Sequence, residues 1–302
     1  MNVSIHFSTT DLRLLVGNPG RASFQIDGFF SARLPEGVMI NGIITAPEPL
    51  AEFLGACNQQ WGPFKHDATV IIENNTIRTR SINLPALRSA QLAPLVRSEL
   101  APLMEEGQDD IVDYATMGSD PQTGAIRALG VVAGRVQLEN YARVVRAAGF
   151  NLKRVDIGTN TLTKLPQILP VLQGGIRLLG IIDGSNLVLV YYQQGVYLLA
   201  KRYRLLAPEA TDERRTEIQG HLSAMVQFQK SQNRDLETDA LYLTGIPPER
   251  VQLFNTGADY LGIPATPLEM PATISLRSQA GFNGAHFDLA AYLYNIGALL
   301  RK

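Results

Sequence analysis

Two apolar β-hairpins constrain the fold of this chain more than any other feature, because one lies near the start of each half. In the first half, strands are predicted over Val3–Phe7 and Leu12–Val16. In the second half, they are predicted over Ile176–Ile182 and Leu187–Tyr192. Helical segments follow the hairpin and end each half. Two such halves facing each other enclose a cleft, so the repeat predicts a two-lobed α/β fold.

The halves divide near residue 158. We predict a first lobe over 1–157 and a second lobe over 158–302. Within the first lobe, residues 1–76 form a core and residues 77–157 read as a β-α-β-β-α-β insertion. In the second lobe, residues 263–285 are rich in Pro, Gly and Ser, which predicts a stretch that is mostly loop.

Two local patterns inside the first lobe give sharper expectations. Strands over Thr69–Ile72 and Ile77–Leu84 are separated by a polar segment containing Asn74 and Asn75, which predicts a hairpin with a tight turn. Apolar residues at helical spacing predict an amphipathic helix over Val136–Ala148. Gly149 follows that helix and suits its C-cap.

Composition excludes several classes of function. The 302 residues carry a net charge of −1, so the chain lacks the overall field that holds nucleic acid or an anionic membrane. Cys57 is the only cysteine, which excludes an internal disulfide, fits a reducing compartment and reads as a buried, inert thiol. The sequence shows neither a signal-peptide pattern nor 18 consecutive apolar residues. We therefore expect a cytoplasmic protein that reaches a membrane only through a partner.

Catalytic motifs are not evident. The histidines His6, His66, His221 and His286 are not spaced as a metal-binding pair, and no P-loop or nucleophile elbow is present. We expect neither catalytic residues nor a bound metal.

Several segments, in order, resemble the PilM family of type IV pilus assembly proteins, which are relatives of the division protein FtsA. The most specific match is to the family's "LP…L…E…P…DY" stretch. It runs over Ile82–Leu87, Leu92, Ser98–Leu103 and Asp113–Tyr114. Further matches, spread over almost the whole chain, are Asn41–Ile44, Leu129–Ala133, Arg146–Phe150, Val155–Ile157 and Leu241–Gly245. The resemblance implies an actin-like (ribonuclease-H-like, duplicated) fold with an FtsA-like inserted subdomain.

The resemblance also shows where the chain departs from an actin-like ATPase at the first hairpin. The phosphate-binding turn corresponds to Ser8, Thr9 and Thr10. The family's aspartate position holds His6, and its glycine position holds Ser8. Magnesium prefers oxygen ligands, so an imidazole is a poor replacement.

The second lobe departs from the family in three further places. The second phosphate turn corresponds to Asp183, Gly184 and Ser185 and is shorter than in the family, so a plain tight turn explains it equally well. At the third turn, the family's Gly-Gly is Gly245-Ile246, followed by two prolines. A small subdomain that the family inserts after Arg202 is largely missing. We therefore expect a degenerate nucleotide site, no ATP or magnesium cofactor and no ATPase activity.

The resemblance implies a function as a binding scaffold. PilM-like proteins hold the cytoplasmic N-terminal tail of a membrane partner, PilN, so we expect a protein peripheral to the inner membrane. Other pilus platform or motor components are further expected partners. The expected groove residues lie on one helix and the strand before it: Leu84, Leu92, Leu95, Val96 and Leu100. For each of these residues a purely structural core role stays open.

Other functions stay open from sequence alone. The chain could be an active actin-like ATPase of the same machinery, with a weak or differently aligned nucleotide site. It could instead serve a type II secretion machine or a mannose-sensitive-haemagglutinin-type pilus. Filament formation like that of FtsA is a further alternative. The oligomeric state, including a homo-oligomer, is not fixed by the sequence.

Overall fold

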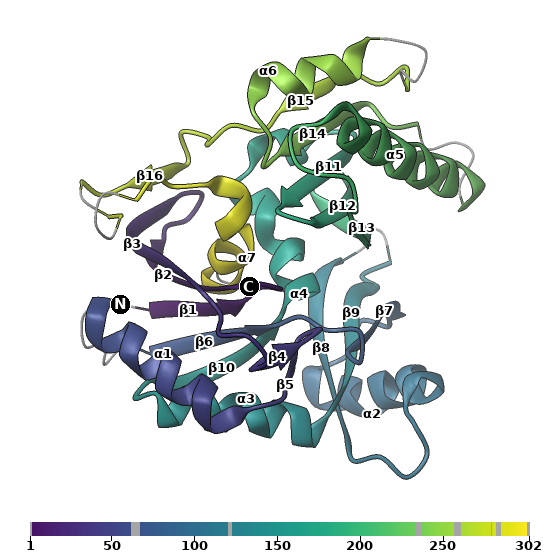
Figure 1. Cartoon of the computed structure of the whole chain (residues 1–302). Helices are drawn as coiled ribbons and strands as arrows, with labels where there is room; N and C mark the ends of the chain where they lie inside the picture. Colours follow the sequence, from purple (N-terminus) through teal and green to yellow (C-terminus); the bar gives the residue numbers. More distant parts are fainter. Residues whose placement is uncertain are drawn as a thin grey trace. The chain divides into compact units, whose positions relative to one another are not determined.

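The chain folds into two compact units (Figure 1). The computed structural model describes residues 2–61, 67–119, 123–232, 237–256, 261–278, 280–281 and 285–300. Unit 1 comprises residues 1–164, 274–287 and 294–302. Unit 2 comprises residues 165–273 and 288–293. None of the helices within the described ranges is long and apolar enough to cross a membrane.

A six-stranded sheet forms the body of unit 1. In sheet order its strands are β10 (Asn151–Ile157), β6 (Asp67–Ile72), β1 (Asn2–Phe7), β2 (Asp11–Pro19), β3 (Phe24–Arg33) and β16 (Ile274–Leu276). The predicted first hairpin is confirmed, since β1 pairs with β2 antiparallel from Asn2↔Gly17 to Phe7↔Leu12. β6 and β10 add to it in parallel.

Strand alternation gives this sheet two covered faces. Val3, Ile5 and Phe7 point to one face, where they form a core with helices α1 (Pro47–Trp61) and α3 (Arg135–Ala147). On the other face, Asn295 of α7 (Leu289–Leu299) donates hydrogen bonds to the carbonyl oxygens of Ser4 and Arg13, at 3.1 and 3.2 Å. Gly149 ends α3 with a φ of 88°, which confirms its predicted role as a C-cap.

An inserted subdomain extends from this body. It consists of a three-stranded antiparallel sheet in the order β7 (Arg78–Leu84), β9 (Ile126–Gly134) and β8 (Asp110–Ser119). Helix α2 (Ser89–Leu100) covers one face of it, and a 3-10 turn follows at Ala101–Leu103. Figure 1 shows α2 packed beside these strands. A small hairpin, β4 (Met39–Ile40) and β5 (Ile43–Ile44), lies in the body near the connection.

Two sequence predictions for the first lobe need correction. The predicted β-α-β-β-α-β order is present, but its last helix and strand, α3 and β10, belong to the body. β10 pairs with β6 in the main sheet, so the separate subdomain ends near Gly134. The predicted hairpin between β6 and β7 is wrong, because β6 pairs with β1 and β10 while β7 pairs with β9.

Unit 2 contains a five-stranded sheet with the second predicted hairpin at its centre. Its strands are, in order, β13 (Val196–Arg204), β12 (Asn186–Gln193), β11 (Ile176–Asp183), β14 (Ala240–Thr244) and β15 (Ala265–Pro267). The long helix α5 (Asp212–Gln232) buries Ile218, Leu222 and Met225 against the sheet. The shorter helices are α4 (Gly158–Lys164), in unit 1, and α6 (Pro248–Val251), with 3-10 turns at Leu165–Gln167, Pro170–Leu172 and Gln252–Asn255.

The C-terminal region differs from the sequence prediction. Residues 274–287 and 294–302 belong to unit 1, although the sequence suggested one continuous second lobe. The reason is strand pairing: β16 joins β3 in parallel, from Ile274↔Phe24 to Leu276↔Ile26. The stretch 263–285 therefore holds two short strands as well as loop.

Candidate functional site

The first hairpin turn, in unit 1, satisfies its own polar groups. Ser8 Oγ accepts a hydrogen bond from the Asp11 N–H at 3.0 Å, and the Ser8 N–H donates to the Asp11 carbonyl at 2.8 Å. Thr10 Oγ1 donates to Asp11 Oδ2 at 2.7 Å. Ser8, Thr9 and Thr10 thus form an ordinary polar turn.

His6, at the position where the family has an aspartate, is buried and paired. Its Nε2 lies 3.0 Å from Glu73 Oε2, and the residue is only 1% exposed. Its ring also contacts the ring of Tyr294, with 5.1 Å between centroids. The imidazole of His6 thus pairs with the carboxylate of Glu73. It stands where the family has an aspartate, whose oxygen could bind a metal.

The second hairpin turn, in unit 2, is short and tight. Asp183 pairs with Asn186, so only Gly184 and Ser185 form the loop. Gly184 has a φ of 54°, as two-residue hairpin loops require. Arg214 of α5 donates one guanidinium N–H to the Gly184 carbonyl and another to the Ala207 carbonyl, the latter at 3.0 Å. The guanidinium group of Arg214 therefore binds a backbone carbonyl of this turn.

The third turn explains why a glycine is retained at position 245. A Cβ atom there would lie 1.7 Å from the Ile182 carbonyl oxygen, and Gly245 has a φ of 86°. Only glycine permits this close approach between the ends of β14 and β11. Gly245 thus has a structural role whether or not a ligand binds.

These two turns of unit 2 border one cavity of about 410 Å³. Asp183, Gly184 and Gly245 line it, while Ser185 does not. Three arginines, Arg214, Arg215 and Arg250, also line it. Sequence reasoning missed these arginines, since only the turns were compared with the family pattern. The predicted residues Ser8, Thr9 and Thr10 belong to unit 1.

Unit 1 contains a larger groove of about 760 Å³. The subdomain contributes a row of side chains from the face of its sheet opposite to α2: Asp113, Ala115, Leu129 and Val131, with Tyr114 beside them. The body contributes β10 and the segments next to it: Asn2, Asn18, Pro19, Asp67, Thr69, Lys153–Ile157, Asn160, Lys164 and Ala298–Leu300.

Two sheet edges border this groove. β10 is the last strand of the body sheet, and β8 is the last strand of the subdomain sheet. Edge strands present backbone N–H and C=O groups that another extended chain can pair with. The exposed residues of β10 include Lys153, Arg154 and Val155.

A buried ion pair lies at the floor of the groove. Lys164 Nζ is 3.0 Å from Asp156 Oδ2, and both side chains are 5% exposed. Asp156 Oδ1 also accepts hydrogen bonds from the Ile157 N–H at 2.8 Å and from Asn160 Nδ2 at 2.7 Å. The carboxylate is therefore fully engaged within the protein.

Four of the five residues predicted to bind the tail take the core role that the sequence left open. Leu84, Leu92, Val96 and Leu100 are buried together in the core of the subdomain, and only Leu95 is exposed, at 38%. None of the five lines the groove. The sequence held a usable signal for the lining of this groove: β9 is apolar at Leu129 and Val131 as well as on its α2 side, so both of its faces should be covered.

The comparisons with known proteins decide the fold. No protein-family model matches the sequence, and no curated protein matches it. Among solved structures, a chain of a PilM–PilN type IV pilus biogenesis complex matches with a TM-score of 0.74 and 16% identity, over 99% of this chain and 95% of that one. The chain has a PilM-like, actin-like fold. The fold predicted from the sequence is confirmed.

Two other structures share this actin-like fold. One is a Bacteroides thetaiotaomicron protein with an actin-like ATPase fold and unknown function, with a TM-score of 0.53, 12% identity, and 97% and 94% of the two chains covered. The other is the cytoplasmic domain of EpsL, an inner membrane component of the Vibrio cholerae type II secretion system. It has a TM-score of 0.51 and 15% identity, with 100% of this chain and 95% of that chain covered.

Proposed function

We propose that this chain is a scaffold in the inner-membrane platform of a type IV pilus or a related type II secretion machine. It binds the extended cytoplasmic N-terminal tail of a PilN-like membrane protein in the groove of unit 1. That partner holds it at the cytoplasmic face of the inner membrane. It does not hydrolyse ATP. The fold shared with a chain of the PilM–PilN complex and with the EpsL cytoplasmic domain supports this role.

The groove between two sheet edges is the observation that carries the proposal. An extended peptide can add to the edge of β8 or β10, so that main-chain hydrogen bonds supply affinity. The apolar residues Leu129, Val131 and Val155 then supply pockets for alternate side chains. The shape thus suits a strand-like tail.

Charges in the groove fit a membrane-protein tail. Asp113 is exposed and lines it, while Asp67 contacts Asn151 and lies 4.0 Å from Lys153, another lining residue. Cytoplasmic segments of inner-membrane proteins are enriched in Lys and Arg, so a basic residue of the tail can pair with Asp113. Such rim pairs contribute more to orientation and association rate than to affinity.

Calorimetry with a synthetic tail tests the proposal. The peptide is the N-terminal cytoplasmic segment of a PilN-like single-span membrane protein from the same genome. Val155→Asp places a charge in the groove at a residue that is 36% exposed, so folding is preserved. We expect affinity to fall roughly 10-fold or more, because an apolar contact is lost and a charge is desolvated.

A matched control is available on α3. Val136 is 69% exposed and does not line the groove, so Val136→Asp makes the same change elsewhere. It should bind the tail like the unchanged protein. Peptides with N-methylated backbone amides should bind weakly if main-chain pairing is used. The proposal fails if no tail binds, or if Val155→Asp and Val136→Asp bind the tail equally well.

The nucleotide part of the proposal rests on the polar groups that would meet phosphate and metal. His6, at the position where the family has an aspartate, is paired with Glu73, so that position offers an imidazole rather than a carboxylate to magnesium. The alternative, an active actin-like ATPase of the same machinery, predicts micromolar ATP affinity with magnesium. Calorimetry with ATP and magnesium separates the two, and micromolar binding would favour the ATPase.

A further inference from the structure

The inserted subdomain has an apolar core of its own. Its buried residues are Ile82, Leu84, Leu92, Val96, Leu100, Ala128 and Val132. The body of unit 1 has a separate core, formed by the main sheet with α1 and α3. Because the two cores are separate clusters, polar contacts where the chain passes between subdomain and body can contribute to the angle between them.

The chain passes between body and subdomain at two adjacent places. It leaves the body after β6, through residues 73–77, and returns from β9 into α3 at Gly134–Gln137. Asn74 shapes the outgoing segment, since its Oδ1 accepts hydrogen bonds from the N–H groups of Thr76 and Ile77, both at 3.0 Å. This side-chain turn redirects the chain from one sheet to the other.

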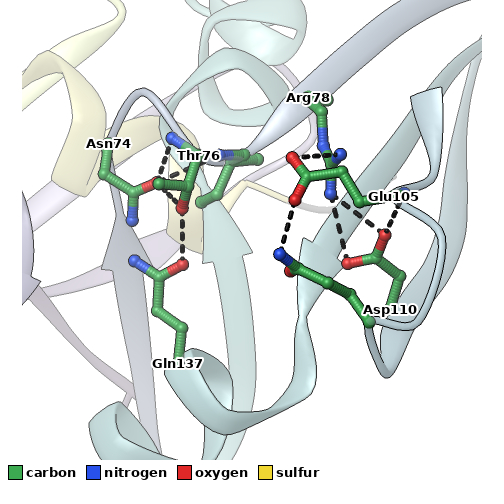
Figure 2. Close-up of polar contacts among 8 residues, drawn as sticks. Asn74, Thr76, Arg78, Glu105, Asp110 and Gln137 are labelled. Carbon is green, nitrogen blue, oxygen red and sulfur yellow. Dashed lines mark hydrogen bonds and ion pairs between the residues drawn. The ribbon is translucent and has the colours of Figure 1, made fainter.

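A hydroxyl joins the outgoing and returning segments. Thr76 Oγ1 lies 2.9 Å from Asn74 Oδ1 and 2.8 Å from Gln137 Oε1, as Figure 2 shows. A threonine hydroxyl carries one proton and donates to only one of these two oxygens. Turning the Gln137 amide by 180° brings its NH₂ group, which is buried without a partner among the described residues, to the hydroxyl as a donor. In that orientation a chain of hydrogen bonds runs from α3 through Thr76 to Asn74.

The body side of this junction is fixed by the β4–β5 hairpin. The Gly42 carbonyl accepts hydrogen bonds from Asn74 Nδ2 at 3.4 Å and from the Tyr141 hydroxyl at 2.7 Å. Burial raises the pKa of Tyr141, so its phenol stays protonated and donates. A Cβ at residue 42 would lie 1.9 Å from the Glu73 carbonyl oxygen, so the hairpin approaches this closely only with glycine.

The subdomain side is fixed by an arginine. Both carboxylate oxygens of Asp110 accept hydrogen bonds from Arg78 Nη2, at 3.0 and 3.2 Å, and Arg78 Nη1 donates to Glu105 at 2.9 Å. Figure 2 shows these contacts beside the Thr76 junction. Arg135 Nε lies 2.6 Å from Asp109 Oδ2 at the start of α3. The start of β7 and the return into α3 are therefore both held to the start of β8.

We propose that Asn74, Thr76 and Gln137 are positioning residues for the groove of unit 1. Their hydrogen bonds hold the inserted subdomain at the angle that sets the width between β8 and β10. None of the three lines the groove, so they act on a bound tail only through this angle. The inference rests on the proposed function, because it specifies how the tail-binding groove is kept in its binding shape. A pre-formed groove binds more tightly, since less ordering free energy is lost on binding.

Thr76→Val is the sharpest test, because it removes the hydroxyl and keeps the branched shape. We expect tail affinity to fall roughly 3- to 10-fold, the effect of one lost hydrogen bond. Thr76→Ser restores the hydroxyl and should bind like the unchanged protein. Thr79→Val is the matched control, because Thr79 is an exposed residue of β7, the strand that follows Thr76.

A second measurement reports the angle without any tail. Spin labels at Leu95→Cys on α2 and Glu52→Cys on α1, in a Cys57→Ala background, give the distribution of distances between subdomain and body. Both labelled positions are exposed. Thr76→Val should broaden or shift this distribution, while Thr76→Ser and Thr79→Val should leave it unchanged.

The outcomes separate the two ideas. If Thr76→Val changes neither the distances nor the affinity while Val155→Asp still weakens binding, positioning is wrong and the proposed function stands. Equal losses for Thr76→Val and Thr76→Ser would also overturn positioning. If no tail binds any variant, the proposed function fails, and the distance distribution alone decides the positioning role: broadening supports it and an unchanged distribution overturns it.

Discussion

The groove of unit 1 and the cavity of unit 2 are both concave and partly polar, yet different backbone structures border them. The groove is bordered by two strands, β8 and β10, at the ends of their sheets. The cavity is bordered by turns that contact their own unit, since the Gly184 carbonyl accepts from Arg214 and Gly245 packs against Ile182. One region is thus bordered by strand edges and the other by internally contacted turns.

Under the proposed function, this difference is how an actin-like body would lose one binding site and keep another. A phosphate site needs free N–H groups and a coordinated cation at its turns. In unit 2, Arg214 supplies the positive charge from within the chain and ties the turn to α5. In unit 1, Lys164 and Asp156 at the groove floor are paired with each other.

The largest change in stability is expected for a substitution at the groove floor. Lys164→Met leaves Asp156 as a buried carboxylate without its cation, which should lower the free energy of unfolding by about 3–5 kcal/mol. Chemical denaturation measures this. Lys153→Met is the control, because Lys153 lies on the same groove but is 58% exposed and 4.0 Å from Asp67. It should change stability by less than about 1 kcal/mol.

A double variant checks the cause of that loss. Lys164→Met with Asp156→Asn removes the unpaired charge but keeps an oxygen to accept the Ile157 N–H. It should recover part of the stability. If the double variant is as unstable as Lys164→Met, an uncompensated charge is not the reason, and the groove floor is less dependent on its ion pair than we infer.

The next largest change in stability is expected for a substitution at the cavity of unit 2. Arg214→Ala leaves the carbonyl groups of Gly184 and Ala207 without their donor, in a region where Arg214 is only 6% exposed. The free energy of unfolding should fall by about 2–3 kcal/mol. Arg204→Ala, at an exposed position of β13, should be nearly neutral. Equal losses for the two variants would mean that Arg214 does not hold the turn.

The sequence predicted the fold well where local pattern and pairing agree. The two hairpins, α3 and its Gly149 cap follow from residue spacing. The failures concern long-range pairing. Nothing local shows that β6 pairs with β1 rather than with β7, or that Ile274–Leu276 returns to the first sheet, because both depend on partners far away in the sequence.

The candidate site shows the same limit. The turn residues Asp183, Gly184 and Gly245 could be located by motif, and the structure brings them to one cavity. Arg214 could not be located this way, since an arginine in the first turns of an amphipathic helix usually points to solvent. Leu92, Val96 and Leu100 of α2 lie in the subdomain core, and the sequence left both roles open because a helical apolar stripe gives the same pattern whether it faces a core or a ligand.

The smallest expected effect is a pH dependence of stability at the loop around Leu206 and Ala207, which Arg214 also contacts. Burial alone would raise the pKa of Glu217, but hydrogen bonds from the Leu206 and Ala207 N–H groups, with the charges of Arg214 and His221, outweigh it and lower the pKa below its usual 4.5. A lowered pKa stabilises the fold above the unfolded value, and this contribution is lost as pH falls through the folded value.

Glu217→Gln should therefore cost about 1 kcal/mol at pH 7. The difference from the unchanged protein should shrink as pH falls below 4.5. Urea denaturation across pH 3 to 7 measures it. Glu213→Gln is the control, because Glu213 is an exposed residue in the first turn of the same helix. A difference that stays constant with pH would show that the carboxylate charge does not hold this loop. Arg214 would then have to hold the loop beside the second hairpin turn without help from Glu217.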